Sequence, residues 1–116
     1  MDVLLFSDNP KLSPSFKARG VFRIKPLGWK DFRREVDLQT APTLCYLDLA
    51  TLPAGRLAGC LRLIRARPQL SYALVDRRGQ FRDVARLFQE GAADYVDREA
   101  LRQGVGARRL LRVLAY

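Results

Sequence analysis

The chain has 116 residues, enough for one domain with its own core, and its 48% hydrophobic and 28% charged residues exclude a disordered chain. It has no histidine, which excludes the commonest general base, the commonest transition-metal ligand and any Ser-His or Cys-His nucleophile pair. The formal net charge of +9 favours an anionic partner, although the same arginines could form an ordinary solvated surface.

Membrane and export signals are missing from the sequence pattern. No apolar run approaches the roughly 20 residues that span a bilayer, and no basic region precedes the short apolar stretch near the start. We therefore expect a cytoplasmic protein without a membrane span. Cys45 and Cys60 both lie within apolar stretches, so we expect buried thiols and no disulfide framework.

Five short apolar runs predict β-strands along the chain. They cover residues 3–6, 21–24, 44–47, 72–75 and 95–96. Longer segments with helical spacing separate them. Because parallel strands need such crossovers, the alternation predicts an α/β domain with one parallel sheet that is covered on both faces.

The first two connections predict weak helices. The segment "NPKLSPSFKARG" leaves room only for a short first helix, because Pro10 and Pro14 disturb it. The segment "GWKDFRREVDL" predicts a modest second helix that buries Trp29, Phe32 and Val36.

Three later segments predict amphipathic helices, the first of which ends before Pro68 and the second at a glycine cap, Gly91. The buried faces are expected to contain Leu57, Cys60, Leu61 and Ile64, then Phe81, Val84, Leu87 and Phe88, and finally Leu110, Leu111 and Leu114. Before the last helix, "EALRQGVG" predicts one helical turn and a glycine loop.

Carboxylates stand at the ends of three predicted strands. Asp8 follows the first run, Asp48 ends the third and Asp76 follows the fourth. In open parallel sheets, sites form beyond the carboxyl ends of the strands. These three residues therefore predict an edge suited to a divalent cation or a phosphate group.

Several stretches resemble the receiver domains of bacterial two-component response regulators. "PTLCYLDLATLP" resembles the family's third strand with its phosphoacceptor, "LRLIRARPQLSYALV" its third helix and fourth strand, and "FQEGAADYVDRE" its entry into the fifth strand. "DVLLFSDN" and "ARRLLRVLAY" resemble the first strand and the last helix. The resemblance implies a flavodoxin-like three-layer sandwich: a five-stranded parallel sheet in the order 2-1-3-4-5 with helices on both faces.

The resemblance also assigns chemical positions. In receivers an aspartate at the end of strand three attacks a phosphodonor while Mg²⁺ bridges it to the phosphoryl oxygens. Asp48 stands at this phosphoacceptor position. Ser7 and Asp8 replace the acidic pair after strand one, so that one carboxylate ligand has become a hydroxyl. Ala50 would offer the carbonyl ligand, but the loop before Pro53 is one residue longer than usual.

Further family positions depart from the pattern. Val75 replaces the Ser or Thr whose hydroxyl binds the phosphoryl group, and Arg98 replaces the lysine. Arginine presents a broad planar fork and not a compact ammonium. We expect Asp48 to pair with Arg98, and Tyr95, at the position of the switch aromatic, to be a fixed core or interface residue.

These departures predict a degenerate receiver, or pseudo-receiver, that spans residues 1–116 as a single domain. It would be a non-enzymatic signalling module with no catalytic residue and no cofactor, and only Asp8 and Asp48 would remain as candidate metal ligands. It would act by protein–protein contact through residues 80–116, and a homodimer through the same residues is one form that this contact could take. A possible patch for an acidic partner consists of Arg77, Arg78, Arg82 and Arg86.

Two other functions remain open at this point. One is a phosphorylatable receiver that uses Asp48 with a weakened Mg²⁺ site. The other is a small basic protein that binds nucleic acid. Against the second, no recognition motif is present and no element interleaves aromatic with basic residues.

Overall fold

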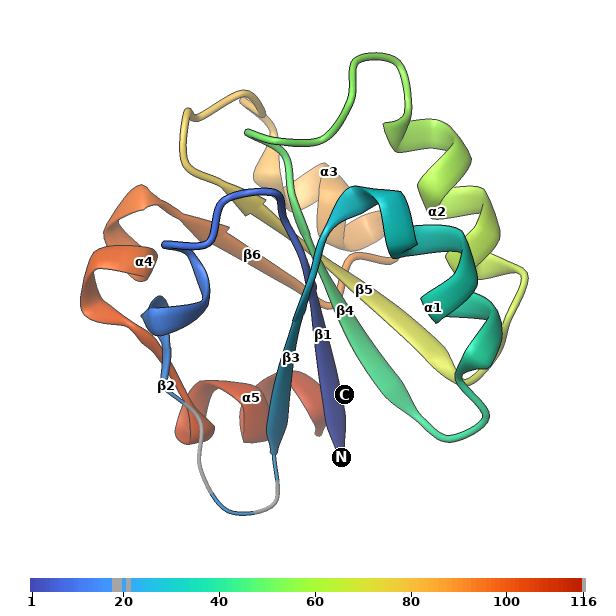
Figure 1. Ribbon diagram of the computed structural model, residues 1–116. Helices are drawn as coiled ribbons and strands as arrows, with labels where there is room; N and C mark the ends of the chain where they lie inside the picture. The colour runs from blue at the N-terminus through green and yellow to red at the C-terminus, as the bar shows by residue number, and fades with distance from the viewer. Residues whose placement is uncertain (18–19, 21, 116) are drawn as a thin grey trace.

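The computed structural model describes residues 1–17, 20 and 22–115, and five strands in this part of the chain form one parallel sheet (Figure 1). Val21, which was expected to begin the second strand, and Tyr116 lie outside the described residues. The strands of the sheet are β1 (Asp2–Phe6), β3 (Arg23–Leu27), β4 (Thr43–Asp48), β5 (Leu70–Asp76) and β6 (Asp94–Asp97).

The strand order is β3-β1-β4-β5-β6, which differs from the expected 2-1-3-4-5. The cause is a short strand that the sequence did not predict, β2 (Phe16–Lys17), which precedes β3 and pairs with β7 (Val105–Gly106) in a separate two-stranded sheet. Within the five-stranded sheet alone, β3 is the second strand along the chain and β4 the third. The α/β class and the five-stranded parallel sheet are confirmed, and the arrangement is consistent with a flavodoxin-like fold.

Helices pack on both faces of the sheet (Figure 1). One face carries α1 (Phe32–Leu38), α2 (Leu57–Arg65) and α3 (Val84–Gln89). The other face carries α4 (Arg98–Gln103), α5 (Ala107–Leu114) and a 3-10 turn, η1 (Ser13–Ser15). Each face therefore has its own apolar core, and the inner strands β1, β4 and β5 are largely buried on both sides, whereas the edge strand β3 has no buried residue.

Alternation along β1 shows how one strand serves both cores. Val3 and Leu5 belong to the core beneath α4 and α5, whereas Leu4 and Phe6 belong to the core beneath α1 and α2. All four side chains are buried, because successive residues of a strand point to opposite faces. This explains why the strands appear in the sequence as continuous apolar runs.

The described residues of the first connection form no α-helix. Their helical part is η1, with proline in its first turn, where a missing N–H is tolerated. The second connection is as expected: η2 (Trp29–Asp31) leads into α1, and the three predicted residues, Trp29, Phe32 and Val36, are all buried.

Two predicted helix faces are partly wrong. Ile64, Leu87 and Leu110 are buried, but Phe88 is 43% exposed and Leu111 is 57% exposed. The helix α3 begins only at Val84, so the helical spacing assumed from Phe81 does not hold. On α5 only a narrow stripe faces the sheet, because adjacent helix residues point about 100° apart.

Other local expectations can be compared directly with the structure. Gly91 follows α3 with a φ of +112°, as a C-terminal glycine cap requires. Helix α4 is longer than the single turn that was expected, and its C-cap is Gly104. Both cysteines are free thiols; Cys45 is fully buried, but Cys60 is only partly buried. No helix in the described ranges is long and apolar enough to cross a membrane.

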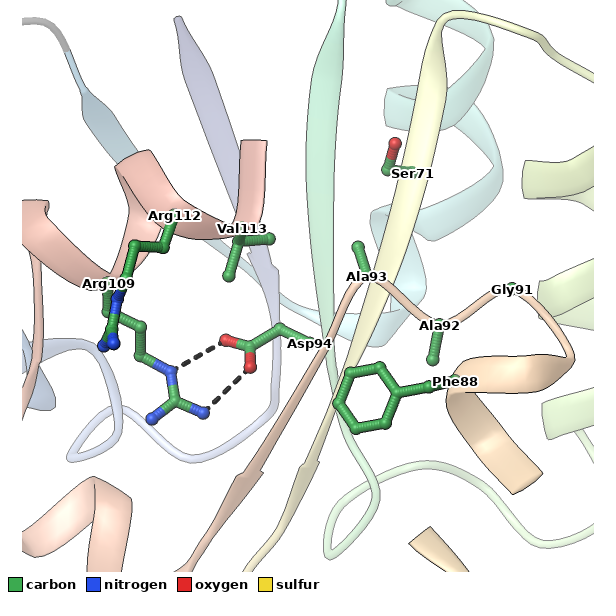
Figure 2. A pocket seen from close by; sticks show the side chains of 9 residues that line it. All are labelled: Ser71, Phe88, Gly91, Ala92, Ala93, Asp94, Arg109, Arg112 and Val113. Carbon is green, nitrogen blue, oxygen red and sulfur yellow. Dashed lines mark hydrogen bonds and ion pairs between the residues drawn. The ribbon is translucent and has the colours of Figure 1, made fainter. Parts of the chain in front are cut away.

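An ion pair attaches α5 to the sheet. Arg109 donates to both carboxylate oxygens of Asp94, at 2.9 and 2.8 Å (Figure 2). The hydroxyl of the buried Tyr46 also donates to Asp94, at 2.7 Å. The hydrogen bonds that Arg109 donates to Asp94 are the main reason that the pKa of Arg109 is raised. These contacts fix the position of α5 beside β6.

Candidate functional site

The candidate site lies at the carboxyl ends of β1, β4 and β5. Asp48 is the last residue of β4, is fully buried and has Val75 of β5 as its register partner. Ser7 directly follows β1, whose end lies beside that of β4. The expectation that these strand ends meet at one edge is confirmed.

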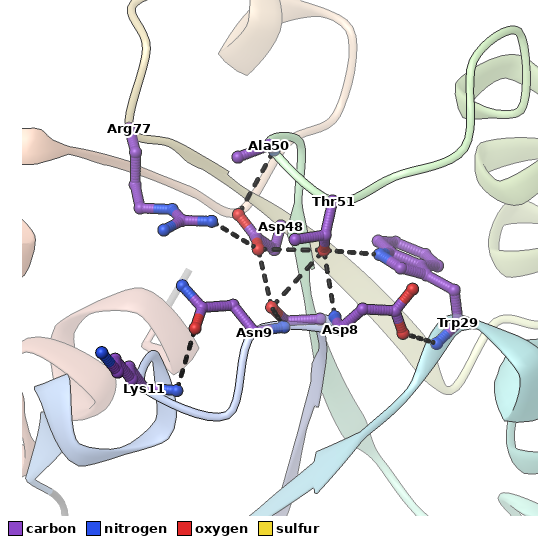
Figure 3. A network of polar contacts seen from close by, with 9 residues as sticks. Asp8, Asn9, Lys11, Trp29, Asp48, Ala50, Thr51 and Arg77 are labelled. Atoms are coloured by element: carbon purple, nitrogen blue, oxygen red, sulfur yellow. Dashed lines mark hydrogen bonds and ion pairs between the residues drawn. The ribbon is translucent and has the colours of Figure 1, made fainter.

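Protein donors surround the carboxylate of Asp48 (Figure 3). Its Oδ2 atom accepts hydrogen bonds from Ser7 Oγ at 2.6 Å, Thr51 Oγ1 at 3.0 Å and Arg77 Nη2 at 3.0 Å, and its Oδ1 atom accepts one from Ala50 N at 3.3 Å. An ionised carboxylate offers about four acceptor positions. Three of the four donors to this carboxylate are therefore concentrated on Oδ2, and Oδ1 accepts only from Ala50 N.

The cation that reaches Asp48 is Arg77, and the expected pairing with Arg98 is not found. The loop after β5 directs the Arg77 side chain to the end of β4, where it is 28% exposed. Arg98 is the first residue of α4. Within the described part of the chain, no acidic group lies within ion-pair distance of its guanidinium.

Thr51 is a site residue that the sequence reasoning missed. Its hydroxyl donates to Asp48 and accepts hydrogen bonds from the backbone N–H of Asp8 and from the indole N–H of Trp29, both at 3.0 Å. One hydroxyl thus joins the ends of β1 and β4 to η2. The available signal was the extra residue in the loop between Asp48 and Pro53, because a longer loop can bring a side chain such as Thr51 back to the end of the strand.

Asp8 and Ser7 have structural partners. Asp8 is exposed, and its Oδ1 atom accepts from Trp29 N at 2.9 Å. Ser7 Oγ accepts from Asn9 N at 3.0 Å while it donates to Asp48. Both side chains therefore help to hold the loops that surround the site.

This arrangement does not fit magnesium. The ion needs hard oxygen ligands in nearly octahedral geometry. The Oδ2 atom of Asp48 already has three donors, one of them the guanidinium of Arg77, and Asp8 uses one oxygen on a backbone N–H. Among the residues that the structure describes, no group of three or more carboxylate, thiol or imidazole side chains could hold a metal ion.

The resemblance to receivers places the two switch positions at Val75 and Tyr95. In the structure Val75 is a core residue, and the hydroxyl of Tyr95 is held by a hydrogen bond. Val75 is fully buried in the apolar core. The hydroxyl of Tyr95 donates to Asp76 at 2.6 Å, and Asp76 also accepts from the backbone N–H groups of Gln80 and Phe81. Burial acts to raise the pKa of Asp76, but these donors outweigh it and leave the pKa below its ordinary value. Burial and the bond to Asp76 raise the pKa of Tyr95.

The four arginines of the predicted partner patch have different surroundings. Arg77 and Arg78 line a cleft beside the site. Arg86 pairs with Glu90 along α3 at 3.0 Å, and Arg82 is exposed. Their role in binding a partner remains a prediction.

A separate hollow of about 720 Å³ lies between α3, β6 and α5, within the region predicted for protein contact (Figure 2). Phe88 lies at its α3 side and Val113 at its α5 side, with Ala92 and Ala93 between them. Its lining combines the exposed Phe88, Ala92, Ala93 and Val113 with the charged side chains of Asp94, Arg109 and Arg112.

Comparison with protein-family models, with curated proteins and with solved structures gave no significant match to this chain. The resemblance to receivers therefore remains a prediction from the sequence motifs. Any function must be argued from the site and from the surfaces around it.

Proposed function

We propose that this chain is a non-enzymatic regulatory module of the degenerate receiver type, which acts through protein–protein contact and not through phosphorylation of Asp48. The observation that carries the proposal is the state of the Asp48 carboxylate. It is fully buried, and its oxygens accept hydrogen bonds from Ser7, Thr51, Arg77 and Ala50.

A carboxylate nucleophile needs a free lone pair and an open approach for the phosphodonor. Oδ1 of Asp48 accepts only from Ala50 N, but the residue is fully buried, so a phosphodonor could reach it only if the surrounding loops opened. The developing charge would then meet Val75, which offers no donor, where receivers place a hydroxyl. A single lost donor at such a site costs about 3 kcal/mol of transition-state stabilisation. These losses together support an inactive phosphoacceptor position.

The contact surface in this proposal is the hollow between α3, β6 and α5. Phe88 is large, aromatic and exposed at its edge, and aromatic residues are enriched where proteins bind one another. Arg112 contributes a positive charge to the same lining. Because two copies of a chain with net charge +9 repel each other, we propose a different protein with an acidic face as the partner.

Phosphorylation can be tested by intact mass spectrometry. The protein and its Asp48→Asn variant are incubated with acetyl phosphate and Mg²⁺, and a receiver that is known to be active serves as the positive control. We expect no mass gain in either form. A gain of one phosphoryl group that is absent from the variant would overturn the proposal and favour the phosphorylatable receiver.

A further inference from the structure

A cleft of about 630 Å³ beside Asp48 collects positive charge from separate segments of the chain. The loop after β1 contributes Lys11, the loop after β5 contributes Arg77 and Arg78, and α4 contributes Arg98 and Arg102. No acidic residue is among the described residues that line it. The cleft exists because η1 and α4 pack against each other where the sequence predicted a first helix and a shorter turn.

Much of this charge is uncompensated. Arg77 pairs with Asp48, and Arg102 pairs with Glu99. Lys11, Arg78 and Arg98 have no acidic partner in the part of the chain that the structure describes. Three free cations around one hollow repel each other, and an anion bound between them would remove that repulsion.

Arg77 provides a second observation. Its Nε atom is buried and has no hydrogen-bond acceptor among the described residues. Buried polar groups in proteins nearly always have a partner, so the chain leaves this guanidinium partly unsatisfied, and the exposed 28% of the Arg77 side chain is the part that an anion in the cleft can reach.

We propose that this cleft binds a small polyphosphate anion with three or more negative charges, such as the polyphosphate part of a nucleotide. Guanidinium groups bind phosphate oxygens through paired N–H donors, and the volume is within the usual range for small-molecule sites. A single phosphate group would leave most of this volume unfilled.

The shape and lining of the cleft favour a compact ligand over a nucleic acid. The cations converge on one hollow and do not follow a stripe along the surface. No aromatic side chain is among the described lining residues, so the stacking platform used for single-stranded bases is missing. Leu12 and Leu101 instead provide a small apolar part of the lining.

Titration calorimetry at low ionic strength tests the proposal, with sodium tripolyphosphate, ADP, ATP and adenosine as separate probes. The test variant is Arg78→Gln with Arg98→Gln. The matched control is Arg82→Gln with Arg108→Gln, which removes the same charge from two exposed arginines outside the cleft. Lys11→Gln is a second test variant, and circular dichroism checks that each protein is folded.

We expect tripolyphosphate to bind at one site per chain, with adenosine not binding. The cleft variant should weaken binding by about tenfold or more, and the control by less than about twofold. Tighter binding of ATP than of tripolyphosphate, which has the same number of phosphates, would identify a nucleotide as the ligand, whereas equal or weaker binding of ATP would identify the polyphosphate alone. Absence of binding, equal weakening by both pairs, no effect of either, or binding only to a single-stranded oligonucleotide would overturn the proposal.

Discussion

The guanidinium of Arg77 donates through Nη2 to Oδ2 of the fully buried Asp48, at 3.0 Å. A buried charge is costly unless it is paired and hydrogen-bonded. The pair therefore stabilises a buried carboxylate at the end of β4. It also connects the loop after β5 to the end of the neighbouring strand.

The first prediction concerns this ion pair. Arg77→Met leaves a buried carboxylate without its cation, although Arg77 is partly exposed and solvent reduces the loss. We expect the free energy of unfolding to fall by about 1–3 kcal/mol in urea denaturation. Arg78→Met, an exposed neighbour, should change it by less than about 0.5 kcal/mol. Equal effects of the two variants would contradict a structural role for the pair.

The second prediction concerns the Thr51 hydroxyl, which donates a hydrogen bond to Asp48 and accepts hydrogen bonds from Asp8 N and Trp29 Nε1. Thr51→Val keeps the shape but leaves two donors without an acceptor, so we expect a loss of about 1–3 kcal/mol. Thr51→Ser retains the hydroxyl and should lose less. The fluorescence of Trp29, the only tryptophan, follows the unfolding and should also shift in the valine variant alone. Identical behaviour of both variants would refute the role of the hydroxyl.

The third prediction is a dependence on pH. The pKa of Asp76 in the folded protein is below its ordinary value of 3.8, so the ionised form is favoured by folding. Its contribution to stability is therefore complete at neutral pH and is lost as the pH falls from about 3.8 through the folded-state pKa. Tyr95→Phe removes one donor and should raise the pKa of Asp76. Carbon-detected NMR titration of the Asp76 carboxyl measures this pKa. An unchanged or lower pKa in the Tyr95→Phe variant would contradict the role of the Tyr95–Asp76 hydrogen bond.

The fourth prediction concerns the contact surface. A photo-crosslinking amino acid at position 88 should give one dominant adduct in the cells from which the protein comes, because Phe88 lies at the edge of the α3–β6–α5 hollow. The same group at position 38, an exposed leucine at the end of α1, is the matched control. An adduct of two copies would indicate a homodimer instead of an acidic partner. No adduct at 88, or the same adducts at both positions, would remove this surface from the proposed function.

The sequence was informative where local pattern decides structure. Apolar runs located four strands of the sheet closely and overlapped the fifth, β3, only at residues 23–24. The resemblance to receivers placed Val75 at the end of its strand, and the structure pairs it with Asp48. The Arg77 pair and the Thr51 bridge were missed because they depend on the paths of two loops, which no periodicity encodes. The outward positions of Phe88 and Leu111 were missed because short helices bury a narrower stripe than their apolar residues suggest.

The two cysteines differ in burial, so the rates at which their thiols react can report on opening of the protein core. Burial raises the pKa of the Cys45 thiol to about 12, so the reactive thiolate is scarce at neutral pH and the central strand also shields it from reagents. Cys60 is only partly buried on α2. Alkylation should therefore reach Cys60 in the native protein and Cys45 only after the core between the sheet and helices α1 to α3 opens. The rate at which Cys45 is modified thus measures how often that core opens.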